Sequence, residues 1–486
     1  MTVARFFGLI AILYFAVLSG CADMRGIGPL SNLQDADELD AGSAIRTARA
    51  PSPLPTGGWW RAYGDTQLNR LIDTALAHNP SLSAAHDRVR VAQAMARAAH
   101  ANELPKVDGS LRLLRQHWPD DAYYGPGALG NSNTWNNTGG MNLAWHIDLW
   151  GRDKNIASSA RDRFRAREAD ELAARLQLQT NIVYAYIDLA LNIALLANEQ
   201  ANTELQQKTV ELVRKRLKAG IATQLELSEA ESPLPGYVKR ITAWKAAVEL
   251  NQHQLAALIG EGPGAGTTIQ RPQIVLEKPI GLPSTLPSEL VGRRPDVIAA
   301  RWEVESRARG VDVARAAFYP NIDLLASIGS FGAAAGFIDF LRAANGGWSA
   351  GPALTLPIFE GGRLRARLAA ATAEYDEAVD RYNRAIIEAI KDIADNVVRV
   401  RSLATQMDAD RRSISVAARS LDLARISQRR GLVNYKNVLV AQANLLQAQN
   451  SAIRTEVDLL KAHAALMASL GGSDPTPRRA NTDASR

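Results

Sequence analysis

The one cysteine of the chain, Cys21, is the residue best placed for covalent chemistry. It follows a basic residue, Arg5, an apolar run from Phe6 to Leu18 and two small residues. A basic start, a short apolar run and small residues before a cut are typical of a secretory signal peptide. The run is too short to cross a bilayer comfortably as a permanent helix.

The tetrapeptide Leu18-Ser-Gly-Cys21 is similar to a bacterial lipobox, in which the cysteine becomes the new N-terminus and is acylated. We therefore expect a signal peptide over 1–20, lipidation of Cys21 and an extended tether over 21–57. Several acyl chains on one cysteine anchor a protein stably in a membrane. The alternative is an ordinary secreted protein with a cysteine near its cut, and Ala22 leaves sorting to the outer membrane open.

Residue patterns typical of catalysis are missing from the sequence. The seven histidines are scattered from His78 to His463, and none forms a zinc-binding pair at helical spacing with a glutamate between. A phosphate-binding glycine loop is also missing. The sequence predicts no enzyme, no catalytic residue, no metal site and no cofactor.

The composition is that of a folded protein rich in helix. Apolar residues make up 47% and charged residues 22%, and the net charge of +6 is modest for 486 residues. Basic and acidic residues are interleaved, so no basic stripe for a nucleic acid is expected. Abundant Ala, Leu, Arg, Glu and Gln favour long helices.

The chain is built as two similar halves. Gly220 and Gly260 recur at the same spacing as Gly431 and Gly471, and the segment that ends at Arg152 recurs as the one that ends at Arg363. Such a duplication usually means two similar units around a pseudo-symmetry axis. We expect a first repeat over 58–262, a linker over 263–286, a second repeat over 287–471 and a disordered tail over 472–486.

Each repeat shows the same order of parts. Helices are expected over 65–103 and 287–318, and exposed loops rich in Gly, Asn and Ala over 117–138 and 330–346. Apolar and polar residues alternate around these loops, which indicates strands with one apolar and one polar face. The expected strands cover 107–113, 141–149, 322–328 and 348–358.

A very long helix is expected after each pair of strands. The stretches between Gly151 and Gly220 and between Gly362 and Gly431 contain no proline and no internal glycine. At 1.5 Å per residue, each would be a helix of roughly 100 Å. Each then turns at a glycine and returns as a helix of about 40 residues, and helices this long need coiled-coil partners.

The expected strands have the length of transmembrane β-strands. Four strands cannot close a barrel, and lipid does not tolerate open sheet edges. Three chains would supply twelve strands, enough for a closed barrel with a lumen. The predicted fold is therefore mainly α with a β-barrel portion, a trimeric duct with a helical tunnel. The alternative is a soluble sheet with one wet face, packed on a coiled coil.

Several segments resemble one family closely and stand in the right order. They are Trp59-Trp-Arg-Ala-Tyr-Gly-Asp65, Gly292-Arg-Arg-Pro-Asp-Val297 and Leu356-Pro-Ile-Phe-Glu-Gly-Gly-Arg363. From about Trp59 to Gly471, the chain resembles the TolC-like outer-membrane factors, in their lipidated NodT-type branch.

This resemblance implies a lipid-anchored homotrimer in the outer membrane that extends into the periplasm. It implies that a periplasmic adaptor protein joins this trimer to an inner-membrane resistance-nodulation-division transporter. The trimer would then be a passive exit duct for small toxic compounds and drugs. Two other functions stay open at this point, a duct for protein secretion and a structural envelope lipoprotein that conducts nothing.

In the resembling family the glycine turns meet the adaptor. The residues expected to dock it are Arg216, Lys218, Gly220 and Thr223 in the first repeat, and Arg429, Arg430, Gly431 and Asn434 in the second. The alternative is a purely structural role, since glycine caps a helix end and cations there favour the helix dipole.

The aperture near these tips departs from the family pattern. In the family an acidic residue stands nine positions after the second tip glycine, where this chain has Val440, and occasionally another stands six positions after it, where this chain has Asn437. Lys436 stands beside them. The first repeat still offers Glu226 and Glu229. We expect Lys436 to pair with one of these carboxylates as a lock, against the alternative that all three are solvated charges of little effect.

A further departure is Pro233-Leu-Pro235, which has no counterpart in the second repeat. Proline in a helix interior removes a hydrogen bond and kinks the rod, so we expect an irregular helix there.

Overall fold

The computed structural model describes residues 24–40, 42, 58–119, 130–275, 292–335 and 337–472. The predicted signal peptide, Cys21, most of the tether and nearly all of the predicted tail lie outside these residues. The chain divides into two compact units. The first holds Met1–Leu33, Val89–Arg167 and Ala300–Tyr382, and the second holds Gln34–Arg88, Glu168–Ala299 and Asn383–Arg486. Each unit therefore draws on both sequence repeats.

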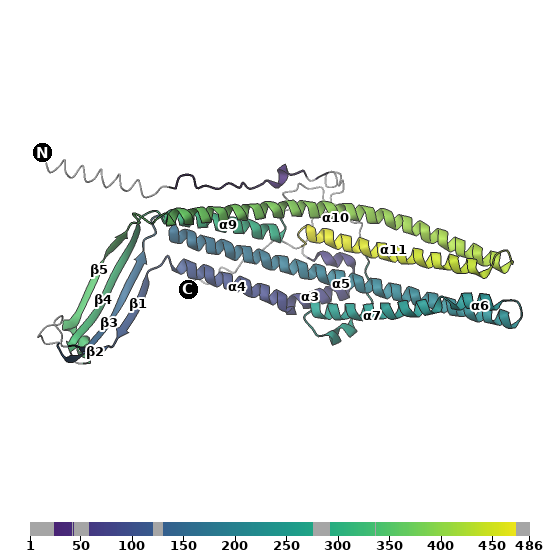
Figure 1. Cartoon of the computed structure of the whole chain (residues 1–486), viewed down its shortest axis with the longest axis horizontal. Coiled ribbons are helices and arrows are strands. Elements are labelled where there is room, and N and C mark those ends of the chain that lie inside the picture. The colour runs from purple at the N-terminus through teal and green to yellow at the C-terminus, as the bar shows by residue number, and fades with distance from the viewer. Residues whose placement is uncertain are drawn as a thin grey trace. The chain divides into compact units, whose positions relative to one another are not determined.

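One antiparallel sheet dominates the first unit (Figure 1). Its path is β1-β3-β4-β5, and the short β2 pairs with the outer part of β3. Because β1 and β2 pair with successive parts of β3, they act as one interrupted strand, and the sheet has the four columns expected. The strands are β1 (Lys106–Arg112), β2 (Arg115–Trp118), β3 (Ser132–His146), β4 (Asn321–Ala335) and β5 (Gly346–Thr355).

The strand bounds differ from the expected ones. Strand β3 begins at Ser132 and β4 continues to Ala335, so much of the two expected loops is paired sheet. Hydrogen bonds from polar side chains stabilise this end of the sheet, where β3 begins and β4 ends. The Asn137 side chain, which is 1% exposed, accepts from Leu114 N–H at 3.1 Å and donates to Phe337 O at 2.7 Å. At the other end, β3 stops at His146 and β5 at Thr355, earlier than the alternation predicted.

Helices that enter and leave the sheet build the rest of the first unit. They are parts of α4 (Pro80–Ala101), α5 (Arg152–Lys218), α9 (Pro295–Ala316) and α10 (Arg363–Arg429). A small apolar cluster, which includes Val311, Phe318, Leu364 and Leu368, packs α9 on the start of α10. Two short 3-10 helices, Asp339–Leu341 (η4) and Ala343–Asn345 (η5), connect β4 to β5.

The two longest helices confirm the expected stretches between glycines. Both α5 and α10 have 67 residues and continue from the first unit into the second. In the second unit each turns at a glycine with positive φ, Gly220 at 72° and Gly431 at 75°. The first returns as α6 (Gln224–Glu231) and α7 (Leu234–Leu258), and the second as α11 (Tyr435–Ser469) (Figure 1).

The interruption between α6 and α7 falls at Pro233, as the proline predicts. Gln206 of α5 is 1% exposed, and its Nε2 donates to Ala230 O at 2.7 Å. A side chain of the neighbouring helix therefore binds the backbone next to the break.

The largest core of the second unit surrounds the base of the hairpins. It includes Tyr63, Ile72, Ile182, Tyr186 and Leu255, all fully buried. This core joins α5 and α7 to α3 (Thr66–His78) and to the 3-10 helix η2 (Trp59–Tyr63). Two other 3-10 helices are η1 (Ala36–Glu38) and η3 (Pro263–Thr268).

Helix α5 also contains an 18-residue window that is long and apolar enough to cross a membrane. Buried core side chains on this helix, such as Ile182 and Tyr186, account for apolar residues in α5.

Candidate functional site

The sheet has one polar and one apolar face. Since alternate residues of a strand point to opposite faces, the strand registers assign each side chain to a face. On the polar face most side chains are small or hydrophilic, and Leu325 is an apolar exception. The members of this face include Asp108, Ser110, Thr138, Gly140, Asn142, Ser327, Gly329, Gly347 and Ser349.

The opposite face is apolar and uncovered in a single chain. Met141, Ile328 and Trp348 stand in one row across β3, β4 and β5 and are 55%, 64% and 79% exposed. Val107, Leu143, Leu324 and Leu354 lie on the same face. A large exposed apolar surface marks contact with lipid or protein, and this alternation is that of a membrane barrel strand.

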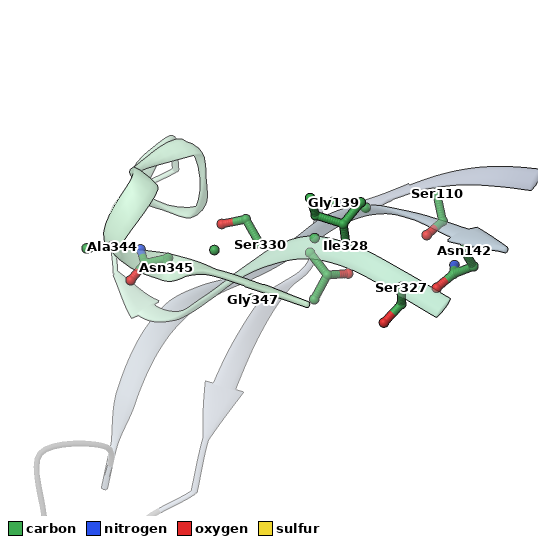
Figure 2. A pocket seen from close by; sticks show the side chains of 13 residues that line it. Ser110, Gly139, Asn142, Ser327, Ile328, Ser330, Ala344, Asn345 and Gly347 are labelled. Atoms are coloured by element: carbon green, nitrogen blue, oxygen red, sulfur yellow. The ribbon is translucent and has the colours of Figure 1, made fainter. Parts of the chain in front are cut away.

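A row of glycines crosses the polar face. Gly140, Gly329 and Gly347 are register partners on three adjacent strands, with Ser110 next in the row. The row forms the floor of a shallow cavity of about 440 Å³. Figure 2 shows the side chains of Ser110, Asn142 and Ser327 at one end of it. Because no side chain rises from the glycines, this level of the face is flat and polar.

Two of these glycines are required by the backbone. A Cβ on Gly140 would lie 2.8 Å from Ile328 O, and one on Gly329 would lie 2.8 Å from Gly139 O. Strands β3 and β4 approach too closely there for any larger residue. A Cβ on Gly347 would meet nothing within 4 Å.

The sheet has two free edges in the part of the chain described. There β1 pairs only with β3, and β5 only with β4. All pairs are antiparallel, so across four columns β1 and β5 run in opposite directions. The β5 edge of one copy can therefore pair antiparallel with the β1 edge of another, which removes both edges from lipid.

A histidine and two aspartates meet where β3 and β4 join the helices. His146 Nδ1 lies 3.0 Å from Asp323 Oδ1, and His146 Nε2 lies 3.8 Å from Asp153 Oδ2 on α5. Asn321 donates to the other Asp323 oxygen at 3.0 Å. These contacts fasten both strands to α5. Among the described residues, no cluster of three or more His, Cys, Asp or Glu could hold a metal ion.

The two helix tips have matching geometry. In the first, Gly220 N–H donates to Leu217 O at 3.0 Å and Ile221 N–H to Arg216 O at 2.9 Å. In the second, Gly431 and Leu432 donate to Gln428 O and Ser427 O, both at 3.0 Å. This glycine cap leaves an aliphatic residue bare at each tip. Ile221 is 67% and Leu432 72% exposed, and neither residue was predicted from the sequence to lie at the docking surface.

The basic residues expected at the tips lie close to these aliphatic ones in the sequence. Lys218, Arg429 and Arg430 are exposed and Arg216 is half-buried. Thr223 and Asn434 occupy the N-cap positions of α6 and α11. Thr223 makes a capping bond and Asn434 makes none.

The aperture residues lie along the same ends of the helices. Lys436, Asn437 and Val440 are exposed on α11. The buried side of α11, with Tyr435 and Val438, packs in a cluster with α6. The two hairpin ends are therefore in contact within one chain.

The expected lock is not formed within one described chain. No ion pair there joins Lys436 to Glu226 or Glu229. The Glu226 carboxylate instead accepts from Thr223 N–H at 2.9 Å, and Thr223 Oγ1 accepts from Glu226 N–H at 3.2 Å. This is a capping box, and the Thr-x-x-Glu spacing could have revealed it from the sequence.

A cavity of about 540 Å³ beside the tips was also not foreseen. It is lined by α5, α10 and α11, with Arg425 and Arg429 among its walls. Gln442 also lines it, is 4% exposed, and its Nε2 has no hydrogen-bond partner. No local pattern in the sequence marks such a residue.

The model of the outer membrane efflux protein family matches residues 71–261 and 286–472. The chain belongs to this family. Fusaric acid resistance protein FusA of Burkholderia cepacia is 54% identical over 369 residues, which are 75% of this chain and 70% of that relative. Multidrug resistance outer membrane protein MdtQ of Escherichia coli O157:H7 is 31% identical over 475 residues, 94% and 96% of the two chains.

Solved structures of outer-membrane channels share the fold. VceC of Vibrio cholerae has a TM-score of 0.80 at 32% identity, and the match covers 86% of this chain and 99% of VceC. The efflux protein is thus an outer-membrane channel component of an efflux pump, of the trimeric class with a β-barrel and a helical tunnel. Its family and fold are those of transport channels.

Proposed function

We propose that this efflux protein is the lipid-anchored exit duct of a pump driven by a resistance-nodulation-division transporter. A periplasmic adaptor joins the two, and it docks on the helix tips at Gly220 and Gly431. The signal peptide covers 1–20, Cys21 carries the acyl chains, and the tether runs to residue 57. The two repeats cover 58–262 and 287–471.

The matched tips are the observation that carries this proposal. Each combines a capped glycine, a bare aliphatic residue and basic residues, and the two tips belong to hairpins that contact each other. Exposed aliphatic side chains with a polar rim are typical of protein interfaces. An apolar residue often follows the glycine of such a cap and packs back on the helix. Ile221 and Leu432 remain 67% and 72% exposed, so packing within the cap does not account for them.

Drug susceptibility tests the docking. In a strain that lacks the chromosomal gene, Ile221→Ser with Leu432→Ser should fail to restore resistance while reaching the outer membrane at normal levels. Val416→Ser is the matched control, because Val416 is 66% exposed on α10 and lies 15 residues before Gly431. Full resistance with the tip variant would show that the adaptor does not use these residues.

Fusaric acid is the first compound we propose as a substrate. The support is the relative with 54% identity, which is named a fusaric acid resistance protein. The polar sheet face carries small side chains and a glycine row, which contact a passing molecule weakly. Selection therefore belongs to the transporter, and the duct is passive. Deletion of the gene should lower the inhibitory concentration of fusaric acid, and an unchanged value would remove this substrate.

A further inference from the structure

The turn between β5 and α10 carries the most exposed large apolar side chain of the described residues. Phe359 is 90% exposed, and Ile358 beside it is 67% exposed. This turn follows β5, which is an edge strand of the sheet. Phe359 lies four residues after β5 ends at Thr355 and four residues before α10 begins at Arg363. A solvent-exposed aromatic ring next to a free strand edge is typical of a surface that another molecule covers.

Two stacked aromatic rings form the wall behind this turn. Trp150 stacks on Tyr319 with ring centroids 4.6 Å apart, and Trp150 Nε1 donates to Pro320 O at 2.8 Å. Together with Phe359 they line a cavity of about 700 Å³. The turn is fixed on its other side by the ion pair of Arg363 with Glu360.

The topology of the sheet determines what can cover the turn. Strand β1 starts at Lys106, just after α4 ends, and β5 ends just before α10 starts. In an antiparallel pair of β5 with β1 of the next copy, the end of β5 therefore lies beside the start of β1. That start is preceded by Leu104 and Pro105, both exposed, and Val107 follows at 56% exposure.

We propose that Phe359 of one protomer packs on the α4–β1 junction of the next protomer, at Leu104, Pro105 and Val107. The cavity beside Phe359 is thus completed by a second copy of the chain, and the contact seals each of the three seams where barrel strands become tunnel helices. The inference rests on the trimer and not on the proposed adaptor or substrate.

A second copy suits this surface better than lipid does. The same cavity is lined by Arg152, Glu360, Arg363 and Arg367. Charged side chains are costly on a face in contact with hydrocarbon. The apolar side chains at the start of β1 in the next protomer offer a surface on which Phe359 can pack. They lie next to the strand pairing between protomers that removes the free edges of the sheet.

Cysteine cross-linking tests the contact in the full chain, extracted in detergent as the trimer. The series combines Phe359→Cys with Leu104→Cys, Pro105→Cys or Val107→Cys, since the register between protomers decides which position faces Phe359. Under mild oxidation, at least one pair should give covalent dimers and trimers. On a denaturing gel of heated samples, the wild-type chain, whose one cysteine is Cys21, and each single variant should run as monomers.

The matched control is Phe359→Cys with Leu111→Cys, about 13 Å further along β1 than Val107. This pair should give no covalent dimers or trimers. A series in which none of the three pairs cross-links, or in which the Leu111 pair cross-links equally well, would overturn the proposal.

Two further measurements separate the partner from lipid. Phe359→Ala should lower the temperature at which the trimer dissociates in SDS, whereas Leu341→Ala, at the opposite end of the sheet and 71% exposed, should not. Phe359→Trp in vesicles with brominated acyl chains should add fluorescence that the lipid does not quench. Quenching of the added fluorescence would show that lipid covers Phe359 and would refute the contact.

Discussion

The hydroxyl of Tyr63 lies 3.0 Å from Nδ1 of His463, on the last long helix, and 3.0 Å from Leu460 O. Tyr63 is fully buried and His463 is 7% exposed. Burial lowers the pKa of His463 to about 4, and burial raises the pKa of Tyr63. The core at the base of the hairpins therefore contains a histidine that is neutral when the protein is folded.

This pair predicts a loss of stability in acid. The ordinary histidine pKa of 6.5 is above the folded value of about 4, so below pH 6.5 the unfolded chain binds a proton that the folded chain does not. Stability from this residue is complete above pH 6.5 and falls as the pH drops toward 4, by about 3 kcal/mol per chain at most. Chemical unfolding of the trimer, followed by helix content at several pH values, measures it.

His463→Gln is the variant that isolates this effect. It keeps a hydrogen-bonding group beside Tyr63 but has no proton to gain, so its stability should change less between pH 6.5 and 4 than that of the wild type. Equal pH dependence in both proteins would show that other groups dominate.

The glycine row predicts a sharp difference between neighbouring substitutions. Gly329→Ala places a Cβ 2.8 Å from Gly139 O and should weaken the barrel by about 1–3 kcal/mol, seen as a lower dissociation temperature of the trimer in SDS. Gly347→Ala, in the same row, meets nothing within 4 Å and should be tolerated. Equal behaviour of the two variants would mean that β3 and β4 do not approach so closely.

The sequence predicted those parts of the fold that depend on local chain properties. Long stretches without proline or glycine gave α5 and α10 almost to the residue, and Pro233 marked the break after α6. The outer half of β3 was assigned to a loop. Its Asn and Thr residues are common in loops, yet Asn137 is buried because it binds backbone groups of two distant segments. Such contacts follow from the tertiary fold.

In the candidate site, too, the sequence predicted the features that depend on local chain properties and missed those that depend on tertiary contacts. The alternation of residues predicted the two faces of the sheet, since it depends only on the strand period. The sequence could also have shown the capping box at Thr223 and Glu226. The unpartnered Gln442 and the backbone contact at Gly140 depend on which helices and strands become neighbours.

Lipidation at Cys21 is a separate prediction. Mass spectrometry of the mature N-terminus should find an acylated Cys21, because the preceding tetrapeptide fits a lipobox. Cys21→Ser should leave the barrel able to fold but poorly anchored or sorted. An unmodified terminus at another residue would end the claim.

The lock at the aperture is predicted between protomers, since one chain does not form it. Lys436→Glu should raise leak conductance in planar bilayers, because three exposed pairs, each of about 0–1 kcal/mol, act together. Glu229→Lys in the same chain should partly restore closure. Glu226→Lys is a poorer partner variant, because Glu226 also caps α6. If Lys436→Ala and Lys436→Glu both leave the conductance unchanged, closure is apolar, with Val440 the nearest candidate.

The most direct test of the account is the efflux of fusaric acid from energised cells. Cells with the wild-type gene should export preloaded fusaric acid, a deletion strain should retain it, and a protonophore should stop export in the wild type because resistance-nodulation-division transporters run on protons. Export that is unchanged by the deletion, or that persists in the protonophore, would contradict an exit duct for this kind of pump.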